Sequence, residues 1–393
     1  MSRLLTAVAP ALPDDGTIGA LAGRVWRPDC AGPSVVAIRD DGVFDISLHF
    51  PTMRDLAEAQ DPATSLRAAS GENLGALAHI LANTPIDHRD PGLPWLLAPI
   101  DLQAIKAAGV TFANSMLERV IEERARGNSD VAAGLRAEVE RLIGNDLSTL
   151  KPGSGQAMAL KAALIKAGAW SQYLEVGIGP DAEIFTKAQP MAAIGTGMDA
   201  GVHPGSSWNN PEPEVVLVVN SGGAIVGATL GNDVNLRDVE GRSALLLGKA
   251  KDNNASASVG PFVRFFDTSF GIDDVRNAVI SLTVAGEDNF RLEGASSMAK
   301  ISRDLEDLAG QMLNAHHRFP DGAVLYCGTM FAPVQDRGAP GQGFTHRTGD
   351  IVTIATPKLG RLVNRVRPTD QCEAWTFGAG ALMRNLAKRG LLG

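Results

Sequence analysis

Three carboxylates flank a pair of short apolar runs in this chain. Glu212 and Glu214 stand one residue apart before the run 215–219, and Asp233 follows the run 224–230. Alternate residues of an extended strand point to the same side, so the two glutamates should project together, roughly 7 Å apart. The Ser-Gly-Gly turn between the runs predicts a β-hairpin. The hairpin would return Asp233 to the end that carries the glutamates.

Three acids gathered in this way need a compensating cation. Converging carboxylates cost several kcal/mol when they are partly desolvated and unpaired. Neither histidine nor cysteine lies among them, and ligation by oxygen alone suits Mg²⁺, with Mn²⁺ as a substitute. The alternative is that Glu212 opens a solvated loop and Asp233 caps a turn. The spacing alone is compatible with both interpretations.

Four segments around these acids resemble core motifs of the fumarylacetoacetate hydrolase family. They are AEIFTKA (182–188), PEPEVVLVV (211–219), GNDVNLRD (231–238) and AKDNNASASVGP (250–261). Their closest form is found in the branch that dehydrates 2-keto-3-deoxy-D-pentonates of the arabinonate and xylonate series. The resemblance covers roughly residues 95–365, with an extra helical segment in between. It implies that Glu212, Glu214 and Asp233 are the metal ligands.

The resemblance also implies an activity, that of a Mg²⁺-dependent hydro-lyase. Such an enzyme converts a 2-keto-3-deoxy-D-pentonate into 2,5-dioxopentanoate. Lys251 is the expected base at C3, provided that burial and the metal lower its pKa, and Glu183 is the expected acid at the C4 oxygen. The two roles are interchangeable at this stage. Lys251 forming a Schiff base with the ketone is a further alternative.

Five other residues are expected to bind the substrate. Thr329 ends a Gly-Thr element that resembles the family's surface for the substrate carboxylate. Arg237 would either steady the carboxylates or serve the fold. The full predicted set is Thr111, Ser115, Lys187, Arg237 and Thr329.

The same family contains hydrolases, which use a histidine from the segment that corresponds to 115–126. This chain has no histidine between His88 and His203. That absence argues against hydrolysis of a C–C bond. Two alternatives to the dehydratase nevertheless stay open: an acylpyruvate or diketo-acid hydrolase, and a non-catalytic protein that binds a keto acid or acts as a scaffold.

The expected fold class is α+β. A small N-terminal α/β domain (1–94) should precede a catalytic domain (95–393), which resembles the family's mixed β-roll or sandwich with flanking helices. The Pro- and Asp-rich run 84–94 predicts the boundary between them. Within the catalytic domain, a helical insertion is expected at about 115–170. It would be plain scaffold, or it would pack near the active-site mouth or at a subunit contact.

Five helices are expected, two of them within the insertion, and apolar stripes mark those at 129–143 and 297–313. Their ranges are 71–81, 129–143, 156–167, 297–313 and part of the tail 370–393. The tail helix is a candidate subunit interface, in a homodimer or homotetramer.

Composition excludes several classes of function. The formal charge is −8 and no basic cluster stands out, which argues against a nucleic-acid partner. No apolar run approaches the roughly 18 residues of a membrane span, and the weakly apolar start is broken by Pro10. Cys30, Cys327 and Cys372 fit neither a disulfide framework nor a zinc site. We therefore expect a cytoplasmic protein.

Overall fold

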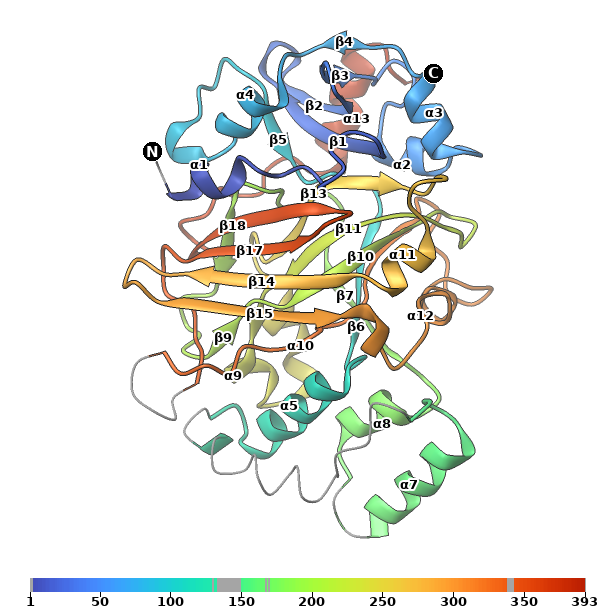
Figure 1. The fold of residues 1–393 in the computed structure, drawn as a ribbon, viewed down its shortest axis with the longest axis vertical. Helices are drawn as coiled ribbons and strands as arrows, with labels where there is room; N and C mark the ends of the chain where they lie inside the picture. Colours follow the sequence, from blue (N-terminus) through green and yellow to red (C-terminus); the bar gives the residue numbers. More distant parts are fainter. Residues whose placement is uncertain are drawn as a thin grey trace.

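The computed structural model describes residues 3–128, 131–132, 150–166, 168, 170–337 and 343–392. Strands and helices are mixed throughout, and the expected α+β class is confirmed. Figure 1 shows the N-terminal strands and helices at one end of the molecule, two sheets in the middle, and a group of helices at the other end.

Eleven described strands form one long sheet, with β5 attached to β1 beside the main path. The order is β4-β3-β2-β1-β13-β11-β10-β16-β6-β7. The bounds are β1 (Ala20–Arg27), β2 (Gly32–Arg39), β3 (Gly42–Asp45), β4 (Glu72–Asn73), β5 (Trp95–Leu97), β6 (Ala104–Gly109), β7 (Glu183–Ala188), β10 (Pro213–Val219), β11 (Ile225–Asp233), β13 (Ala257–Phe265) and β16 (Ala323–Tyr326). The N-terminal strands join the rest through β1 and β13, whose register pairs Ala20 with Phe265. The sheet thus crosses residue 94, and the domain boundary proposed there stays a prediction.

A second sheet packs against this one and completes a sandwich. Its order is β15-β14-β17-β18-β8. The bounds are β8 (Asp199–Val202), β14 (Val279–Ala285), β15 (Arg291–Ser297), β17 (Ile351–Thr356) and β18 (Gly360–Pro368). Leu217 and Leu230 of the first sheet share one hydrophobic core with Leu282 and Ile354 of the second. A short ladder of β9 (Asn209–Asn210) and β12 (Asn235–Leu236) lies apart from both sheets.

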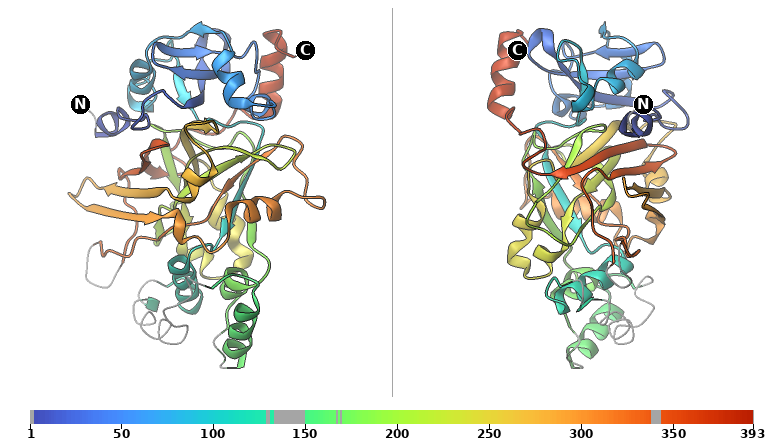
Figure 2. Two further views of the ribbon diagram at one scale, coloured as in Figure 1. Left: turned by 45° about the vertical axis from the view of Figure 1, so that its right-hand side comes forward. Right: turned by 90° about the vertical axis from the view of Figure 1, so that its left-hand side faces the viewer.

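The helices gather mainly at the two ends of the sandwich (Figure 2). At the N-terminal end are α1 (Arg3–Val8), α2 (Met53–Ala57), α3 (Pro62–Ala68), α4 (Leu77–Ala82) and the C-terminal α13 (Ala379–Lys388). The other helices are α5 (Ala113–Arg124), α7 (Gly155–Lys166), α8 (Gln172–Ile178), α9 (Arg237–Glu240), α10 (Leu247–Lys251), α11 (Ile272–Arg276) and α12 (Leu305–Met312). Short 3₁₀ turns are η1 (Pro28–Cys30), η2 (Ile86–His88), η4 (Ala244–Leu246) and η5 (Met298–Lys300). Among the helices that the structure describes, none has the run of about 18 apolar residues that a membrane span requires.

Two of the predicted helices are shorter than expected. Within the predicted helix 71–81, residues 72–73 instead form β4, and the helix starts only at Leu77. The reason is a turn between them, in which the Asn73 side chain accepts a hydrogen bond from Gly75 N (2.8 Å). Gly75 follows with φ +105°, which L side chains rarely adopt. In 297–313, the backbone N–H of Ser302 donates to Thr111 O (2.8 Å) and interrupts the helix, which restarts behind the N-cap Asp304.

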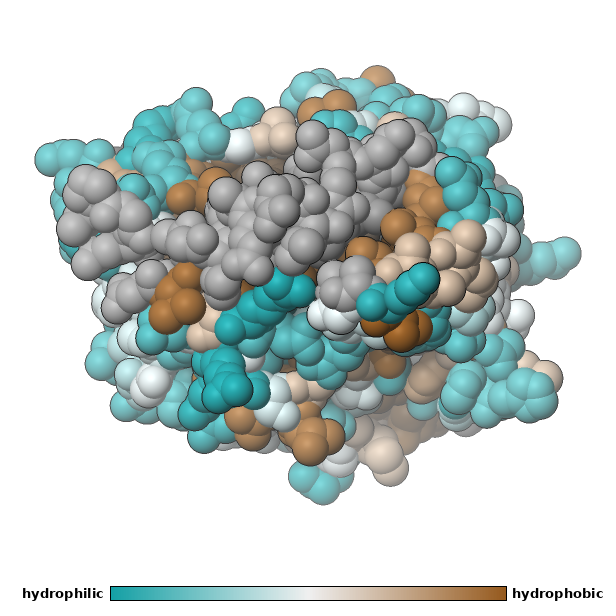
Figure 3. All heavy atoms as spheres, turned by 90° about the horizontal axis from the view of Figure 1, so that it is seen from below, coloured by the Kyte–Doolittle hydropathy of each residue, from teal (hydrophilic) through white to brown (hydrophobic). Residues whose placement is uncertain are grey.

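The predicted helix 156–167 is confirmed as α7, and the tail contains α13. Of the predicted helix 129–143, only residues 131–132 lie within the described residues. Figure 3 shows the end of the molecule that carries α5, α7 and α8. The residues coloured by hydropathy there are a mixture of hydrophobic and hydrophilic ones. The role of the insertion as scaffold, active-site cover or subunit contact stays a prediction.

Candidate metal centre and active site

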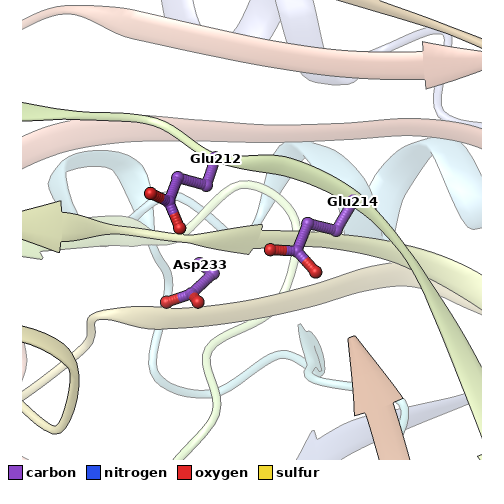
Figure 4. A group of neighbouring side chains, drawn as sticks. All are labelled: Glu212, Glu214 and Asp233. Atoms are coloured by element: carbon purple, nitrogen blue, oxygen red, sulfur yellow. The ribbon is translucent and has the colours of Figure 1, made fainter. Parts of the chain in front are cut away.

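The predicted hairpin is confirmed, and it brings the three acids together. β10 and β11 pair with Glu214 opposite Gly231, and backbone and side-chain hydrogen bonds between Glu212 and residues 232–233 hold the end closed. Figure 4 shows the three carboxylates pointing toward one another from neighbouring strands. One oxygen of each lies within 4.8 Å of the others, and each residue is only 1% exposed. The alternative in which Glu212 opens a solvated loop is therefore wrong.

Glu214 is held by the chain that follows β16. Its carboxylate accepts hydrogen bonds from Gly328 N (2.7 Å) and from the Thr329 hydroxyl (3.3 Å). Gly328 has φ +103°, and a Cβ at this position would lie 1.9 Å from the Thr111 hydroxyl oxygen. A glycine is thus required for the close approach that lets its N–H reach Glu214.

Three cationic side chains contact the carboxylates. Lys251 Nζ lies 2.6 Å from Glu212 Oε2 and 3.0 Å from Asp233 Oδ2. Lys187 Nζ lies 2.9 Å from Asp233 Oδ1, and Arg119 Nη2 forms an ion pair with Glu212. Buried carboxylates without such partners would be strongly destabilising, so these side chains stabilise Glu212 and Asp233 in the metal-free protein.

The ion pairs set the protonation states of the cluster. Burial opposes ionisation of Glu212, but Lys251 and Arg119 outweigh it and lower the pKa of Glu212 to about 2. Burial together with the charges of Asp233 and Glu212 raises the pKa of Glu214 well above its usual range. Burial alone would lower the pKa of Lys251, yet Asp233, Glu212 and Glu240 outweigh it, so this pKa is raised. Without a metal, Lys251 is thus a charged ammonium group, and the lowered pKa that the sequence suggested for a base is not present.

The residues present fit a hard dication. The donor set consists of carboxylate oxygens only, and these are the ligands that Mg²⁺ and Ca²⁺ prefer. The raised pKa of Glu214 shows that the cations already present do not balance all three acids. A divalent ion at this point would supply the missing positive charge.

Both predicted catalytic residues line a small cavity beside the carboxylates. Glu183 comes from the start of β7 and Lys251 from the end of α10. Burial and the charge of Glu240 raise the pKa of Glu183 to about 7. Val110, a β-branched residue with φ +59°, also lines the cavity, and strained backbone of this kind is concentrated at functional sites. The lining includes Ser115, Arg119, Glu183, Glu240, Lys251 and Thr329 with the three acids.

Three of the predicted substrate-binding residues lie behind this lining. The Thr111 hydroxyl donates to Cys327 O (2.6 Å). Lys187 donates to Val234 O (3.1 Å) and to the backbone oxygen of Lys251 (2.5 Å) besides pairing with Asp233. Arg237 pairs with Glu118 and Glu122 at 3.0 and 2.7 Å. In this conformation the three residues support the walls of the cavity, and only Ser115 and Thr329 of the predicted set are placed to touch a ligand there.

Sequence reasoning missed Arg119 and Glu240. Arg119 pairs with Glu122 (2.7 Å), with Glu240 (2.8 Å) and with Glu212, so it links α5 and α9 to the cluster of three carboxylates. The only signal in the sequence is the spacing of Arg119 and Glu122, three apart in a predicted helix, which suggests an ion pair. The burial of this pair became visible only in the structure.

The raised pKa of Glu183 leads to a prediction for the metal-free protein. Below pH 4.5 this carboxyl is protonated in both the folded and unfolded states, and between pH 4.5 and 7 only the unfolded state ionises. The free energy of unfolding should therefore fall over that interval, by about 3 kcal/mol relative to Glu183→Gln. Urea titrations from pH 4 to 8 in EDTA measure this difference. The exposed Glu287→Gln serves as control, and parallel pH profiles of wild type and E183Q would contradict the assignment.

Known proteins are similar in sequence to the part of the chain that carries these motifs. Residues 180–367 match the model of the fumarylacetoacetate (FAA) hydrolase C-terminal domain. The chain is 32% identical over 185 residues to 2-dehydro-3-deoxy-D-arabinonate dehydratase of Saccharolobus solfataricus, covering 47% of this chain and 58% of that protein. It is 31% identical over 194 residues to the probable 2-keto-3-deoxyxylonate dehydratase of Haloferax volcanii, covering 49% and 63%. Each match thus spans less than two thirds of the relative.

A solved structure of 2-keto-3-deoxy-D-arabinonate dehydratase complexed with magnesium and 2,5-dioxopentanoate has the same fold. Its TM-score is 0.60 at 20% identity, over 88% of this chain and 99% of that chain. The hairpin, the three acids and Lys251 all fall within the segment that matches the family model. Residues 180–367 therefore resemble the C-terminal domain of fumarylacetoacetate hydrolases in sequence, and the chain shares its fold with the solved dehydratase structure.

Proposed function

We propose that this protein is a Mg²⁺-dependent dehydratase of a 2-keto-3-deoxy-D-pentonate, and that it forms 2,5-dioxopentanoate with loss of water. One observation carries the proposal: Glu183 and Lys251 line the same small cavity as Glu212, Glu214 and Asp233. The activities named for the two curated relatives support the choice of substrate class.

In this proposal Glu212, Glu214 and Asp233 would hold the metal, which would polarise the ketone and stabilise negative charge on its oxygen. Ser115 and Thr329 present hydroxyl groups to the substrate from opposite elements, α5 and the segment after β16. Lys187 and Arg237 hold Asp233 and α5 in position from behind the lining.

Proton transfer is assigned to the two remaining groups. Glu183 has a pKa near 7 and so keeps its proton for donation to the departing C4 hydroxyl. Lys251 removes the proton from C3. Its high pKa is due to Asp233, Glu212 and Glu240, so a cation that neutralises the first two also weakens its hold on the proton. The reverse assignment of acid and base is the alternative for the same reaction.

A substrate assay with two outcomes tests the function. The full chain with MgCl₂ is incubated separately with 2-keto-3-deoxy-D-xylonate and with an acylpyruvate, and products are followed by NMR. An aldehyde from the first substrate, abolished by EDTA and restored by Mg²⁺, is expected. Pyruvate released from the acylpyruvate would instead identify a C–C hydrolase. Tight keto-acid binding without turnover of either substrate would identify a binding or scaffold protein.

Assembly and location are part of the proposal. We propose a homodimer or homotetramer in the cytoplasm, acting on a small keto acid and on neither nucleic acid nor membrane. The formal charge of −8 supports the exclusion of nucleic acid. Light scattering after size-exclusion chromatography gives the subunit number.

Arg119 offers a further prediction for the metal site. Its guanidinium competes with the metal for Glu212, because one carboxylate cannot serve both cations fully. Arg119→Gln should therefore bind Mg²⁺ more tightly, by about three- to tenfold, a change of roughly 1 kcal/mol. Isothermal titration calorimetry measures the Kd. The control is Arg126→Gln, an exposed position just after the same helix. If R119Q instead bound Mg²⁺ more weakly than wild type, Arg119 would support the carboxylates and would not compete with the metal.

A further inference from the structure

A second cavity, of about 290 Å³, lies outside the metal site. It is formed where β1 and β5 meet the loop that follows β7 and the tail segment 373–377, which leads toward α13. Its volume is close to the lower limit for small-molecule sites in proteins. Nothing in the proposed dehydratase chemistry uses this cavity.

Aromatic rings form much of its wall. Trp26 and Trp95 face each other across the β1–β5 pair, with ring centroids 5.8 Å apart in a stacked arrangement. Phe377 from the tail meets Trp26 edge-on at 5.1 Å, and Trp375 lies at the rim, 46% exposed. Three of the chain's five tryptophans thus line one cavity. Such rings present flat apolar surface at a low entropic cost of ordering.

One cation of the lining is buried. Arg24 shares a strand face with Trp26, two residues away, and is 5% exposed. Its Nη1 donates to Ile100 O (2.5 Å) and Ala98 O (3.3 Å), whereas the contact made by Nη2 is to Met191 Sδ at 4.0 Å. Sulfur is a weak acceptor, so this end of the guanidinium is poorly satisfied.

The charge of Arg24 is only partly balanced. The nearest carboxylate, that of Asp101, is 3.8 Å from Arg24 Nε and also accepts backbone hydrogen bonds from Met53 (2.7 Å) and Leu102 (2.7 Å). Burial lowers the pKa of Arg24. A buried cation with a poorly satisfied donor favours an anionic partner.

The charges of the lining exclude a cationic ligand. Among the described residues, the only acid in the lining is Glu373. Its carboxylate is already paired with Arg89 at 2.9 Å, and the Arg89 guanidinium stacks on the Trp95 ring at 4.6 Å. A positively charged ligand would meet Arg24 without a free carboxylate to compensate it.

The backbone around the cavity is strained. Met191 and Ala255, both in the lining, have φ values of +70° and +58°. Residues other than glycine in this region each cost on the order of 1–3 kcal/mol and are concentrated at ligand sites. Both are held there by backbone hydrogen bonds, from Met191 N to Asp101 O (2.9 Å) and from Gly201 N to Ala255 O (2.9 Å).

We propose that this cavity is a second binding site, for a small flat carboxylate. Its carboxylate pairs with Arg24, and its apolar body lies against Trp26 and Trp95. The site is independent of the proposed dehydratase activity, since it shares no lining residue with the metal cavity.

Calorimetric titration of the full chain with benzoate, in EDTA, tests this site. Benzoate should bind, and benzyl alcohol, which lacks the charge, should bind at least about tenfold more weakly, because a charge-assisted pair is lost. Arg24→Met should weaken benzoate binding by a similar factor. Ala193→Phe, which keeps Arg24 and fills the space between the walls, should weaken it as well. Arg67→Met, at an exposed position of α3, is the matched control and should bind benzoate as wild type does.

Three results would overturn the proposal. One is the absence of benzoate binding, and another is equal affinity in wild type and in both A193F and R24M. The third is loss of benzoate binding in Arg119→Gln, which removes a cation of the metal cavity and would place the ligand there. If circular dichroism shows that R24M is unfolded, the A193F variant alone decides between the outcomes.

Discussion

Lys251→Met should lower kcat of the proposed dehydration by at least about a hundredfold, the usual contribution of one positioned proton-transfer group. Methionine matches the length of the buried lysine stem but has no ammonium group. Lys251 is 2% exposed and lies between Glu212 and Asp233, so the variant also removes a cation from between two buried acids. The metal-free variant should lose about 3–5 kcal/mol of stability, since breaking a buried ion pair leaves its partner uncompensated.

Added Mg²⁺ should distinguish the effect of K251M on kcat from its effect on stability. Added Mg²⁺ compensates the same acids, so it should restore the free energy of unfolding in K251M while leaving kcat low. Urea denaturation with and without Mg²⁺, together with the product assay, gives both quantities. Lys249→Met, exposed on the same short helix, is the control. Recovery of activity along with stability in K251M would limit Lys251 to a structural role.

Glu214→Gln should strongly weaken Mg²⁺ binding but leave the metal-free protein as stable as wild type. Its pKa is raised well above the usual range, so Glu214 is already protonated in the absence of metal, and glutamine is close in shape to that neutral form. The amide oxygen can still accept the hydrogen bond from Gly328 N. Loss of one of three carboxylate ligands should weaken Mg²⁺ by at least about a hundredfold, a cost of roughly 3 kcal/mol.

Glu212→Gln is the matched comparison, because the two acids are two residues apart and equally buried. The pKa of Glu212 is lowered to about 2, so it is ionised above that pH and its ion pairs stabilise the fold at neutral pH. That stability should be present above pH 4.5 and be lost as the pH falls toward 2. E212Q should thus lose both Mg²⁺ binding and about 3 kcal/mol of metal-free stability. Equal destabilisation by E212Q and E214Q would show that both acids are ionised without metal.

Local sequence predicted that the three acids meet at one end of a hairpin, and their burial, which excludes the solvated loop, came from the structure. A β-hairpin places residues i and i+2 on one side and returns its second strand to the same end, so Glu212, Glu214 and Asp233 had to meet once the two apolar runs paired. The oxygen-only donor set and the choice of a hard dication follow from the same three residue types. The motifs around Glu183 and Lys251 predicted two more residues of the lining, through resemblance to a family and not through geometry.

Only the tertiary structure decided how these groups are charged. The pKa of Lys251 depends on whether burial or the neighbouring acids dominate, and that balance requires Glu240, which α9 brings to the site. Arg119 reaches Glu212 because α5 packs against α9, although the two residues are 93 positions apart in the chain. Interactions of this kind depend on packing between distant elements, which local periodicity does not encode. For the same physical reason, the residues of the Arg24 cavity came together only in the folded chain.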